Sequence, residues 1–253
     1  MTGGWYLWLD TIPRSGAWNM AADSTLLSAA QRGQAWLRLY QWNPACLSFG
    51  RNEPALQRYD RERIAQFGLN VVRRPTGGRA VWHATEVTYA VAAPVSTFGS
   101  LSETYAVVHR LLAHAVSHLG LSAAIATRPA AGHAGLGAGA CFASPAGGEV
   151  VLDTGKLIGS AQVREGTAFL QHGSILLQND QDVVSSVTRG NAAAPVAASL
   201  SHALGRSISF EEVAEVVAEE ARSDWEGTWT DAACEPSLDL IAHFADPAWT
   251  WRR

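Results

Sequence analysis

A helical pattern of apolar and polar positions is clearest over residues 102–119. Apolar side chains recur there three or four positions apart, at Tyr105, Val108, Leu112, Val116 and Leu119. This spacing places them on one face of a helix, and Gly120 is typical of the residue that ends one. The histidines of this stretch are predicted to lie on its solvated face: His109, His114 and His118.

Short apolar or alternating runs before this helix predict β-strands separated by turns. The predicted strands cover residues 5–10, 36–42, 46–50, 69–74 and 81–93, the last interrupted near Ala84. Two helices are predicted between them, residues 19–30 with Asn19 as N-cap and residues 60–67. Further strands and a loop fill residues 123–177.

After residue 180 the pattern becomes mainly helical. Helices are predicted at residues 196–204, at 210–222 with Ser209 as N-cap, and at 238–244. Strands and helices follow no regular βαβ order, which predicts an α+β fold built on a mixed β-sheet with helices packed on it. We place one domain at residues 1–180. A mainly helical C-terminal extension, packed on the same domain, covers residues 181–253.

Composition indicates an ordinary globular protein. Hydrophobic residues make up 47% of the 253 residues and charged residues 17%, which argues against disorder. The formal net charge of −4 argues against a nucleic-acid partner. No apolar run reaches the roughly 18–20 residues that span a bilayer, and no signal pattern opens the chain, so we expect no membrane contact.

Three widely spaced cysteines, Cys46, Cys141 and Cys234, form no CxxC pair. This usage predicts a reduced, cytoplasmic protein with no structural zinc. Cys46 lies in a predicted strand and is interpreted as a small buried hydrophobe, while Cys234 has no partner motif. Cys141 follows a stretch rich in Gly and Ala and stands near Lys156 in the sequence. A nearby ammonium group favours the thiolate, which is the nucleophilic form.

Two motifs carry the candidate chemistry. Residues 73–83 read RRPTGGRAVWH, in which two glycines turn the chain beside three arginines. Glycines allow φ > 0 and the close approach of a ligand, and guanidinium groups bind carboxylates or phosphates through fixed pairs of donors. Residues 155–162 read GKLIGSAQ and place Lys156 on a tight turn before an alternating strand. Together the motifs predict a pocket for a small acyl or acyl-phosphate group.

Both motifs, followed by QHGSILL at residues 171–177, closely resemble the catalytic domain shared by lipoate–protein ligases, protein octanoyltransferases and biotin–protein ligases. The resemblance extends from about residue 5 to about residue 177, so it identifies residues 1–180 as a catalytic domain of this type. It implies substrate-binding roles for the following residues: Arg73, Arg74, Thr76, Gly77, Gly78, Arg79, His83, Gly159, Ser160, Ala161, His172 and Gly173.

Simpler roles stay open for several of these residues. The arginines could be solvated turn charges, and Gly77 and Gly78 could serve the turn alone. Arg79 stands where many relatives have a third glycine, which weakens the case for a loop that cradles a nucleotide. His83 and His172 are predicted to organise the site as ring donors. We expect no metal site, because no second ligand stands at metal-binding spacing beside either histidine.

The segment CFASP at residues 141–145 resembles the octanoyltransferases best known from Gram-positive bacteria. This resemblance implies that Cys141 is the nucleophile, and that Lys156 holds the acyl carbonyl oxygen and assists proton transfer. The implied reaction needs no cofactor. It moves an octanoyl group from octanoyl-acyl carrier protein, through an acyl-cysteine intermediate, to a lysine of a lipoyl domain. That domain would belong to glycine cleavage H protein or to the E2 subunit of a 2-oxoacid dehydrogenase.

Three alternatives stay open. A lipoate–protein ligase would use ATP and Mg and work through lipoyl-adenylate, keeping the lysine without needing the cysteine. A biotin ligase fits less well, because the cysteine segment and QHGSILL are more similar to the lipoyl branch. A silent acyl-binding or lipoyl-domain-docking protein fits least, because both Cys141 and Lys156 are present.

Overall fold

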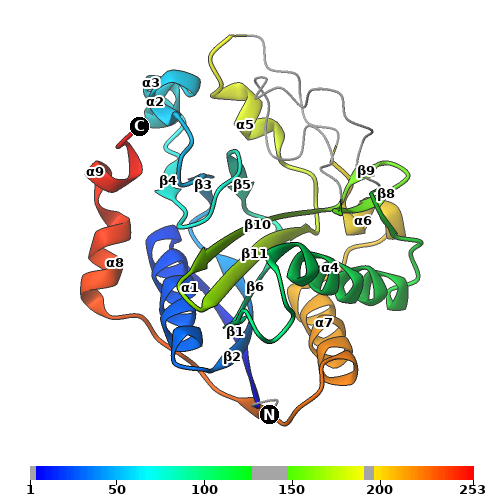
Figure 1. Ribbon diagram of the computed structural model, residues 1–253. Coiled ribbons are helices and arrows are strands. Elements are labelled where there is room, and N and C mark those ends of the chain that lie inside the picture. The colour runs from blue at the N-terminus through cyan, green and yellow to red at the C-terminus, as the bar shows by residue number, and fades with distance from the viewer. Residues whose placement is uncertain (1–3, 127–147, 191–196) are drawn as a thin grey trace.

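A mixed six-stranded β-sheet is the centre of the fold (Figure 1). The computed structural model describes residues 4–126, 148–190 and 197–253. The sheet has the order β10-β11-β6-β2-β1-β12. Its strands are β1 (Trp5–Arg14), β2 (Ala35–Trp42), β6 (Glu86–Pro94), β10 (Ile158–Glu165), β11 (Ala168–Leu176) and β12 (Trp229–Asp231). β1 pairs in parallel with β2 and β12, whereas the other neighbours are antiparallel.

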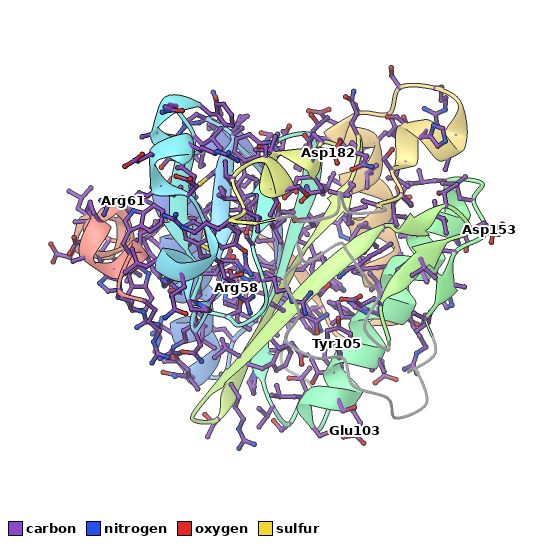
Figure 2. The ribbon with its side chains drawn as sticks, turned by 90° about the horizontal axis from the view of Figure 1, so that it is seen from above. Arg58, Arg61, Glu103, Tyr105, Asp153 and Asp182 are labelled. Carbon is purple, nitrogen blue, oxygen red and sulfur yellow. The ribbon has the colours of Figure 1, made fainter. Side chains whose placement is uncertain are left out.

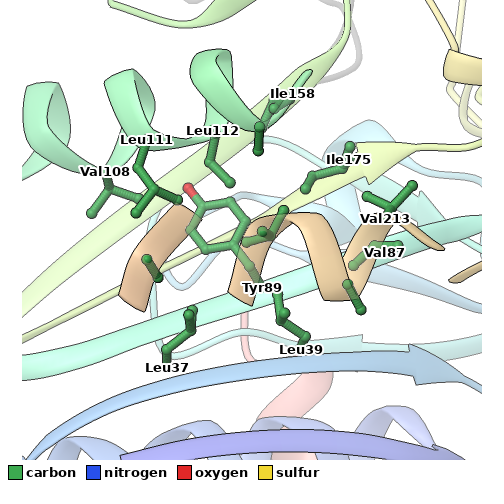
Figure 3. Packing of buried hydrophobic residues seen from close by; sticks show 14 of the residues in the cluster. Leu37, Leu39, Val87, Tyr89, Val108, Leu111, Leu112, Ile158, Ile175 and Val213 are labelled. Atoms are coloured by element: carbon green, nitrogen blue, oxygen red, sulfur yellow. The ribbon is translucent and has the colours of Figure 1, made fainter. Parts of the chain in front are cut away.

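Helices cover both faces of this sheet. One face carries α1 (Gly16–Gln31) and α8 (Leu238–Ala245), and the other carries α4 (Leu101–His118) and α7 (Phe210–Asp224). Side chains of β2 alternate between the two cores: Leu37 and Leu39 pack on the α4 side, Trp36 and Tyr40 on the α1 side. Figure 3 shows the α4-side core, in which Tyr89 lies among leucine and valine side chains. The sheet is therefore buried on both faces.

Two three-stranded sheets hold the ends of the motif at residues 73–83 and the start of the motif at residues 155–162. One has the order β4-β3-β5 and the other β7-β8-β9. Their strands are β3 (Cys46–Phe49), β4 (Asn70–Arg73), β5 (Val81–His83), β7 (Ala124–Ile125), β8 (Val150–Leu152) and β9 (Gly155–Lys156). The remaining helices are short: α2 (Ala55–Arg58), α3 (Arg61–Gln66), α5 (Asp182–Ser186), α6 (Leu200–Leu204) and α9 (Pro247–Thr250).

The predicted α+β fold with a mixed sheet and C-terminal helices is confirmed. The strand break near Ala84 is also confirmed, because β5 ends at His83 and β6 begins at Glu86. Ser209 caps α7 as predicted. The segment after residue 180 adds β12 to the edge of the main sheet and packs α7 and α8 on its two cores.

Three predicted boundaries were wrong. α1 begins at Gly16 and is capped by Ser15, because Asn19 lies buried inside the helix and donates its side-chain amide to the backbone oxygen of Gln41. β1 continues to Arg14. α6 begins only at Leu200. Among the described residues, no helix is long and apolar enough to cross a membrane.

Candidate active site

A narrow pocket opens between the β10–β11 hairpin and the small sheet that contains β5. Most of its wall surface is apolar, which suits a hydrocarbon chain better than a charged ligand. The strand period places His172 and Ser174 of β11 on the same sheet face as Thr88 of β6. The lining residues are Met20, Tyr40, Trp42, Arg74, Val81, His83, Thr88, Gly159, Ser160, Ala161, His172, Gly173 and Ser174.

Most residues of the predicted substrate-binding set meet at this pocket. Arg74, His83 and His172 lie in its wall together with Gly159, Ser160, Ala161 and Gly173. Thr76 contacts His172, since Oγ1 of Thr76 lies 2.6 Å from Nε2 of the ring. Sequence segments that begin at residues 73, 155 and 171 thus converge in space.

The two neighbouring arginines of the first motif have different surroundings. Arg74 donates to the backbone oxygens of Gly77 and Arg79 at 3.1 Å and 2.8 Å, which folds the glycine turn over the pocket. Arg73 is fully buried and donates instead to backbone oxygens, among them those of Gly50 and Thr250. Arg73 therefore lies away from the pocket and ties the C-terminal segment to the loop after β3.

Glycine is required at two positions of the site for different reasons. Gly78 has φ +91°, and a Cβ there would lie 3.2 Å from Nη2 of Arg74 and 3.8 Å from Cβ of Ala161. A Cβ at Gly173 would lie 2.4 Å from the backbone oxygen of Gly159, so no side chain fits between β10 and β11. Gly77 has open space around its Cβ position, and sterics do not require glycine there.

Replacing Gly78 by valine tests whether the turn forms the wall of the pocket. The positive φ strains any β-branched residue, by about 1–3 kcal/mol, and the new side chain points toward Ala161. We expect loss of acyl loading in a protein that still melts cooperatively. Gly120→Val is the matched control, because Gly120 has φ +90° and open space around it. Acyl loading and thermal melting are measured on the same samples. Equal loading by the two variants would contradict the assignment of the glycine turn to the pocket wall.

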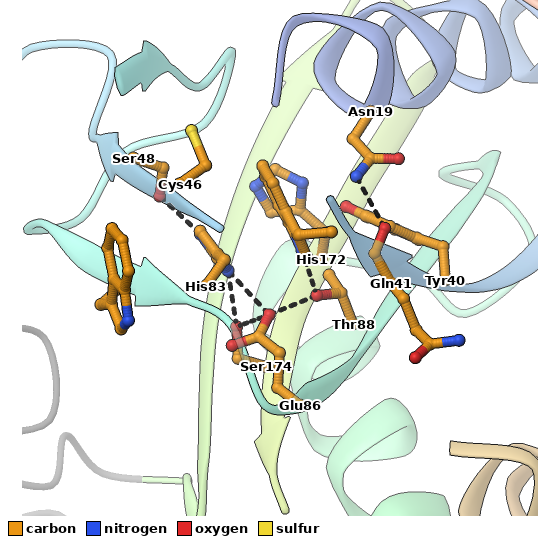
Figure 4. A network of polar contacts seen from close by, with 12 residues as sticks. Asn19, Tyr40, Gln41, Cys46, Ser48, His83, Glu86, Thr88, His172 and Ser174 are labelled. Carbon is orange, nitrogen blue, oxygen red and sulfur yellow. Dashed lines mark hydrogen bonds and ion pairs between the residues drawn. The ribbon is translucent and has the colours of Figure 1, made fainter. Parts of the chain in front are cut away.

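A chain of hydrogen bonds links the buried carboxylate of Glu86 through His83 to Ser48 (Figure 4), and Ser48 in turn bonds Arg74. Glu86 accepts from Nδ1 of His83 at 2.7 Å, and Nε2 of the same ring lies 2.6 Å from Oγ of Ser48. Arg74 donates to Oγ and to the backbone oxygen of Ser48. Arginine has only donors, so Oγ of Ser48 accepts from Arg74, and the carboxylate of Glu86 accepts from Nδ1 of His83. The His83 ring is thus held between Glu86 and Ser48 and is stacked on Trp42 at 4.0 Å between ring centres.

A second chain of the same kind supports the other side of the turn. Asp23 accepts from Nδ1 of His172 at 2.8 Å, and Nε2 of His172 faces the hydroxyl of Thr76. Burial lowers the pKa of His172, with the carboxylate of Asp23 opposing that shift. Tyr40 and Arg38 also donate to Asp23, at 2.8 Å and 3.0 Å. Two carboxylate–imidazole–hydroxyl chains therefore fix the turn from Arg74 to Arg79 over the pocket.

Ser48→Ala tests the first chain. The change leaves Arg74 without one acceptor and Nε2 of His83 without its partner in a buried site, which we expect to cost about 1–3 kcal/mol of unfolding free energy. Acyl loading should fall, while Ser48→Thr, which keeps a hydroxyl, should restore most of it. In the wild-type protein, ¹⁵N spectra of the imidazole should show a proton on Nδ1 of His83, where Glu86 accepts it. A ring without a proton on Nδ1 would contradict the assigned hydrogen bond to Glu86.

Lys156 lies on β9, is 2% exposed and is not among the residues that line the pocket. Its Nζ forms an ion pair of 2.7 Å with Oε1 of the buried Glu149. Cys141, the predicted nucleophile, lies outside the described residues. Cys46 is buried as predicted, and burial raises the pKa of its thiol, so it is unsuited to nucleophilic chemistry.

The placement of His109 on the solvated face of its helix was wrong. His109 is fully buried, and its Nε2 lies 2.8 Å from Oγ of Ser160, which in turn bonds the hydroxyl of Tyr89. Burial lowers the pKa of His109 to about 4, and Lys156 adds to this effect, so the ring is neutral near pH 7. Position 109 shares the helical spacing of Tyr105 and Leu112, and that signal places it on the buried face.

Several functional candidates were not apparent from the sequence. Ser48, Glu86 and Glu149 belong to no motif, and only the tertiary structure brings them to His83 and to Lys156. Asp23 stands in the predicted helix 19–30, where no role was assigned to it, and the fold brings it to His172. Within the parts of the chain that the structure describes, no group of three or more His, Cys, Asp or Glu residues could hold a metal ion.

Comparisons with known proteins show what this chain is similar to. Residues 15–222 match the family described as the lipoyl protein ligase A/B catalytic domain. The octanoyltransferase LipM of Kyrpidia tusciae is 37% identical over 269 residues, covering 97% of this chain and 98% of that protein. LipM of Symbiobacterium thermophilum is 34% identical over 239 residues, covering 86% and 85%.

Solved structures share the fold at low sequence identity. A bipartite lipoate protein ligase from Thermoplasma acidophilum superposes with a TM-score of 0.77 at 18% identity, over 99% of this chain and 97% of that chain. A lipoate-protein ligase A bound with ATP gives a TM-score of 0.73 at 18% identity, over 99% of each chain. These likenesses establish the fold of the chain.

Proposed function

Because the chain belongs to the family of lipoyl protein ligase A/B catalytic domains, we propose that it is an acyltransferase that octanoylates proteins in lipoylation. The observation that carries the proposal is the 37% identity to an octanoyltransferase along 97% of the chain. The narrow, mainly apolar pocket supports it, since each buried methylene group of an acyl chain contributes about 0.8 kcal/mol.

The reaction has two acyl-transfer steps. In the first, the Cys141 thiolate attacks the thioester carbonyl of octanoyl-acyl carrier protein, and the carrier thiol leaves with a proton. In the second, the ε-amine of a lipoyl-domain lysine attacks the acyl-cysteine carbonyl, an amide bond forms, and the Cys141 thiol is released. No external cofactor enters either step. Among the described residues Cys46 and Cys234 are free thiols, which suits a reducing cytoplasm.

Lys156 supplies positive charge for the carbonyl oxygen that becomes negative in both steps. Its fixed position beside the buried Glu149 supports this role, because a preorganised cation needs no rearrangement during the reaction. Ser160 and His109 connect the neighbourhood of Lys156 to the pocket wall. The two hydrogen-bonded chains described above hold the opposite wall.

The acceptor is a lipoyl domain, of glycine cleavage H protein or of an E2 subunit. The Thermoplasma ligase is described together with its E2 lipoyl domain, which supports an acceptor of this class for a chain of the same fold. The alternative is an ATP-dependent lipoate–protein ligase, since a ligase of the same fold binds ATP.

Intact-mass spectrometry distinguishes the two reactions. The protein is mixed with octanoyl-acyl carrier protein in the absence of ATP, and transfer predicts a mass increase of one octanoyl group. Neutral hydroxylamine should remove the group, because it cleaves thioesters, and peptide mapping should place it on Cys141. Acylation of the lipoyl domain only with free acid, ATP and Mg would support the ligase instead.

A further inference from the structure

Positive charge is concentrated in one part of this acidic chain. Residues 51–79 hold seven arginines and three acidic residues, and two more arginines stand at positions 252 and 253. The net charge of the whole chain is −4, so negative charge gathers elsewhere. α7 alone contributes six acidic side chains, at positions 211, 212, 215, 219, 220 and 224.

Six of these nine arginines stand in segments that contact one another. We define the arginine surface as Arg51, Arg58, Arg61, Arg63, Arg252 and Arg253. Nη2 of Arg252 donates to the backbone oxygen of Arg51 at 2.6 Å. The backbone N–H of Leu56 donates to the oxygen of Arg253, and the Arg61 guanidinium lies 5.0 Å from the centre of the Trp251 ring. Segments that are 200 residues apart in the sequence thus form the same face.

The positive charge on this surface is only partly compensated. Arg61 and Arg63 are exposed, and so are Arg252 and Arg253. The nearby acids are engaged locally. Glu53 is buried beside Arg58, Glu165 pairs with Arg51 at 3.4 Å, and Glu62 is exposed. Asp60 caps α3 and also lies 4.0 Å from Nε of Arg63. Burial, then Arg253 and Arg51, lowers the pKa of Arg252. The positive charges of Arg51, Arg252 and Arg253 therefore repel one another.

The arginine surface adjoins the mouth of the pocket. Gly50, which precedes Arg51, lies so close to Gly78 that a Cβ at Gly50 would be 2.0 Å from the Gly78 oxygen. The backbone N–H of Arg51 donates to the oxygen of Thr76 at 2.7 Å. Figure 2 shows Arg61 at the left and Arg58 left of centre, whereas Asp153 lies at the right edge and Glu103 at the bottom. A protein seated on this surface would reach the glycine turn directly.

We propose that the arginine surface docks an acidic face of the acceptor protein, beside the lysine that receives the acyl group. The inference rests on the proposed transfer function. A lysine ends in an ammonium group on a stem of four carbons, so its protein must sit against the rim of the pocket. Arginines at the rim repel that ammonium group unless acidic residues surround it. Complementary charge also steers the two proteins together, an effect that salt weakens.

The test compares charge reversal on this surface with charge reversal elsewhere. Arg61→Glu/Arg63→Glu changes two exposed arginines that lie outside the pocket wall. Arg110→Glu/Arg206→Glu is the matched control, because it makes the same charge change at exposed positions on α4 and before α7. Each variant is first loaded with a small octanoyl thioester, which needs no protein docking. Single-turnover transfer to a lipoyl domain is then followed between low and high salt.

We expect normal loading of both variants and transfer slowed by about tenfold at low salt in the Arg61→Glu/Arg63→Glu variant alone. Its rate should also depend less on salt than the wild-type rate does. Transfer at the wild-type rate, or equal loss in the control, would overturn the docking site. Slower loading from octanoyl-acyl carrier protein with unchanged transfer to the lipoyl domain would also overturn the proposal. The arginine surface would then bind the donor protein and not the acceptor. If the wild-type protein does not load at all, the proposed transfer function is refuted. The docking surface is then tested by calorimetry, which compares the affinity of each variant for a lipoyl domain with that of the wild-type protein.

Discussion

Replacing Cys141 by serine should abolish octanoyl transfer. Serine keeps the size of the side chain, but an alcohol is almost fully protonated at neutral pH and is a far weaker nucleophile than a thiolate. Loss of a covalent nucleophile typically lowers turnover by several orders of magnitude. The measurement is octanoylation of a lipoyl domain by octanoyl-acyl carrier protein, followed by intact mass.

Cys234→Ser is the matched control for this change. Cys234 is half-buried, and burial raises the pKa of its thiol, so we expect normal activity. Both variants should melt as the wild-type protein does. Near-normal transfer by Cys141→Ser would exclude the acyl-cysteine mechanism, and the ATP-dependent ligase would then be the better description.

Replacing Lys156 by alanine should lower activity by about 10²–10³-fold. This is the usual effect of losing one preorganised charge contact to a developing oxyanion, which raises the barrier by about 3–4 kcal/mol. The same change has a second effect. It leaves Glu149, which is 3% exposed, as a buried carboxylate without its 2.7 Å ion-pair partner. Breaking a buried ion pair from one side commonly costs about 3–5 kcal/mol of stability.

A double variant separates the two effects. Lys156→Met/Glu149→Gln removes both charges, so no buried carboxylate is left uncompensated, and stability should return toward the wild-type value. Activity should stay as low as in the single variant, because the cation is still absent. Calorimetric melting and single-turnover loading on the same samples give both quantities. Recovery of activity along with stability would show that Lys156 only supports the fold.

Features that depend on neighbours along the chain were predictable from the sequence. The helical spacing of residues 102–119 corresponds to α4, and the break near Ala84 divides β5 from β6. The glycine turn is another such feature, because Gly78 has the positive φ that favours glycine. The family motifs also led to most of the pocket wall, including Arg74, His83 and His172.

His109 shows how an available local signal was missed. Its position is three residues before Leu112 and four after Tyr105, both on the predicted apolar face. A polar ring on that face needs partners, and these come from Ser160 and from the backbone oxygen of Gly148, which lie far along the chain. Helical spacing indicates burial, but only the packing of α4 on the sheet shows what the ring contacts.

Arg73 and Arg74 separate what a sequence determines from what tertiary structure decides. Both stand at the end of a strand beside two glycines, and the sequence alone assigns them the same role. Successive side chains of a strand point to opposite faces. Arg73 meets the backbone oxygen of Thr250, and Arg74 meets Ser48 and the glycine turn. Local spacing sets helices, strands and turns, because their hydrogen bonds join near neighbours. The partner of each buried charge depends on segments that only the complete fold brings together.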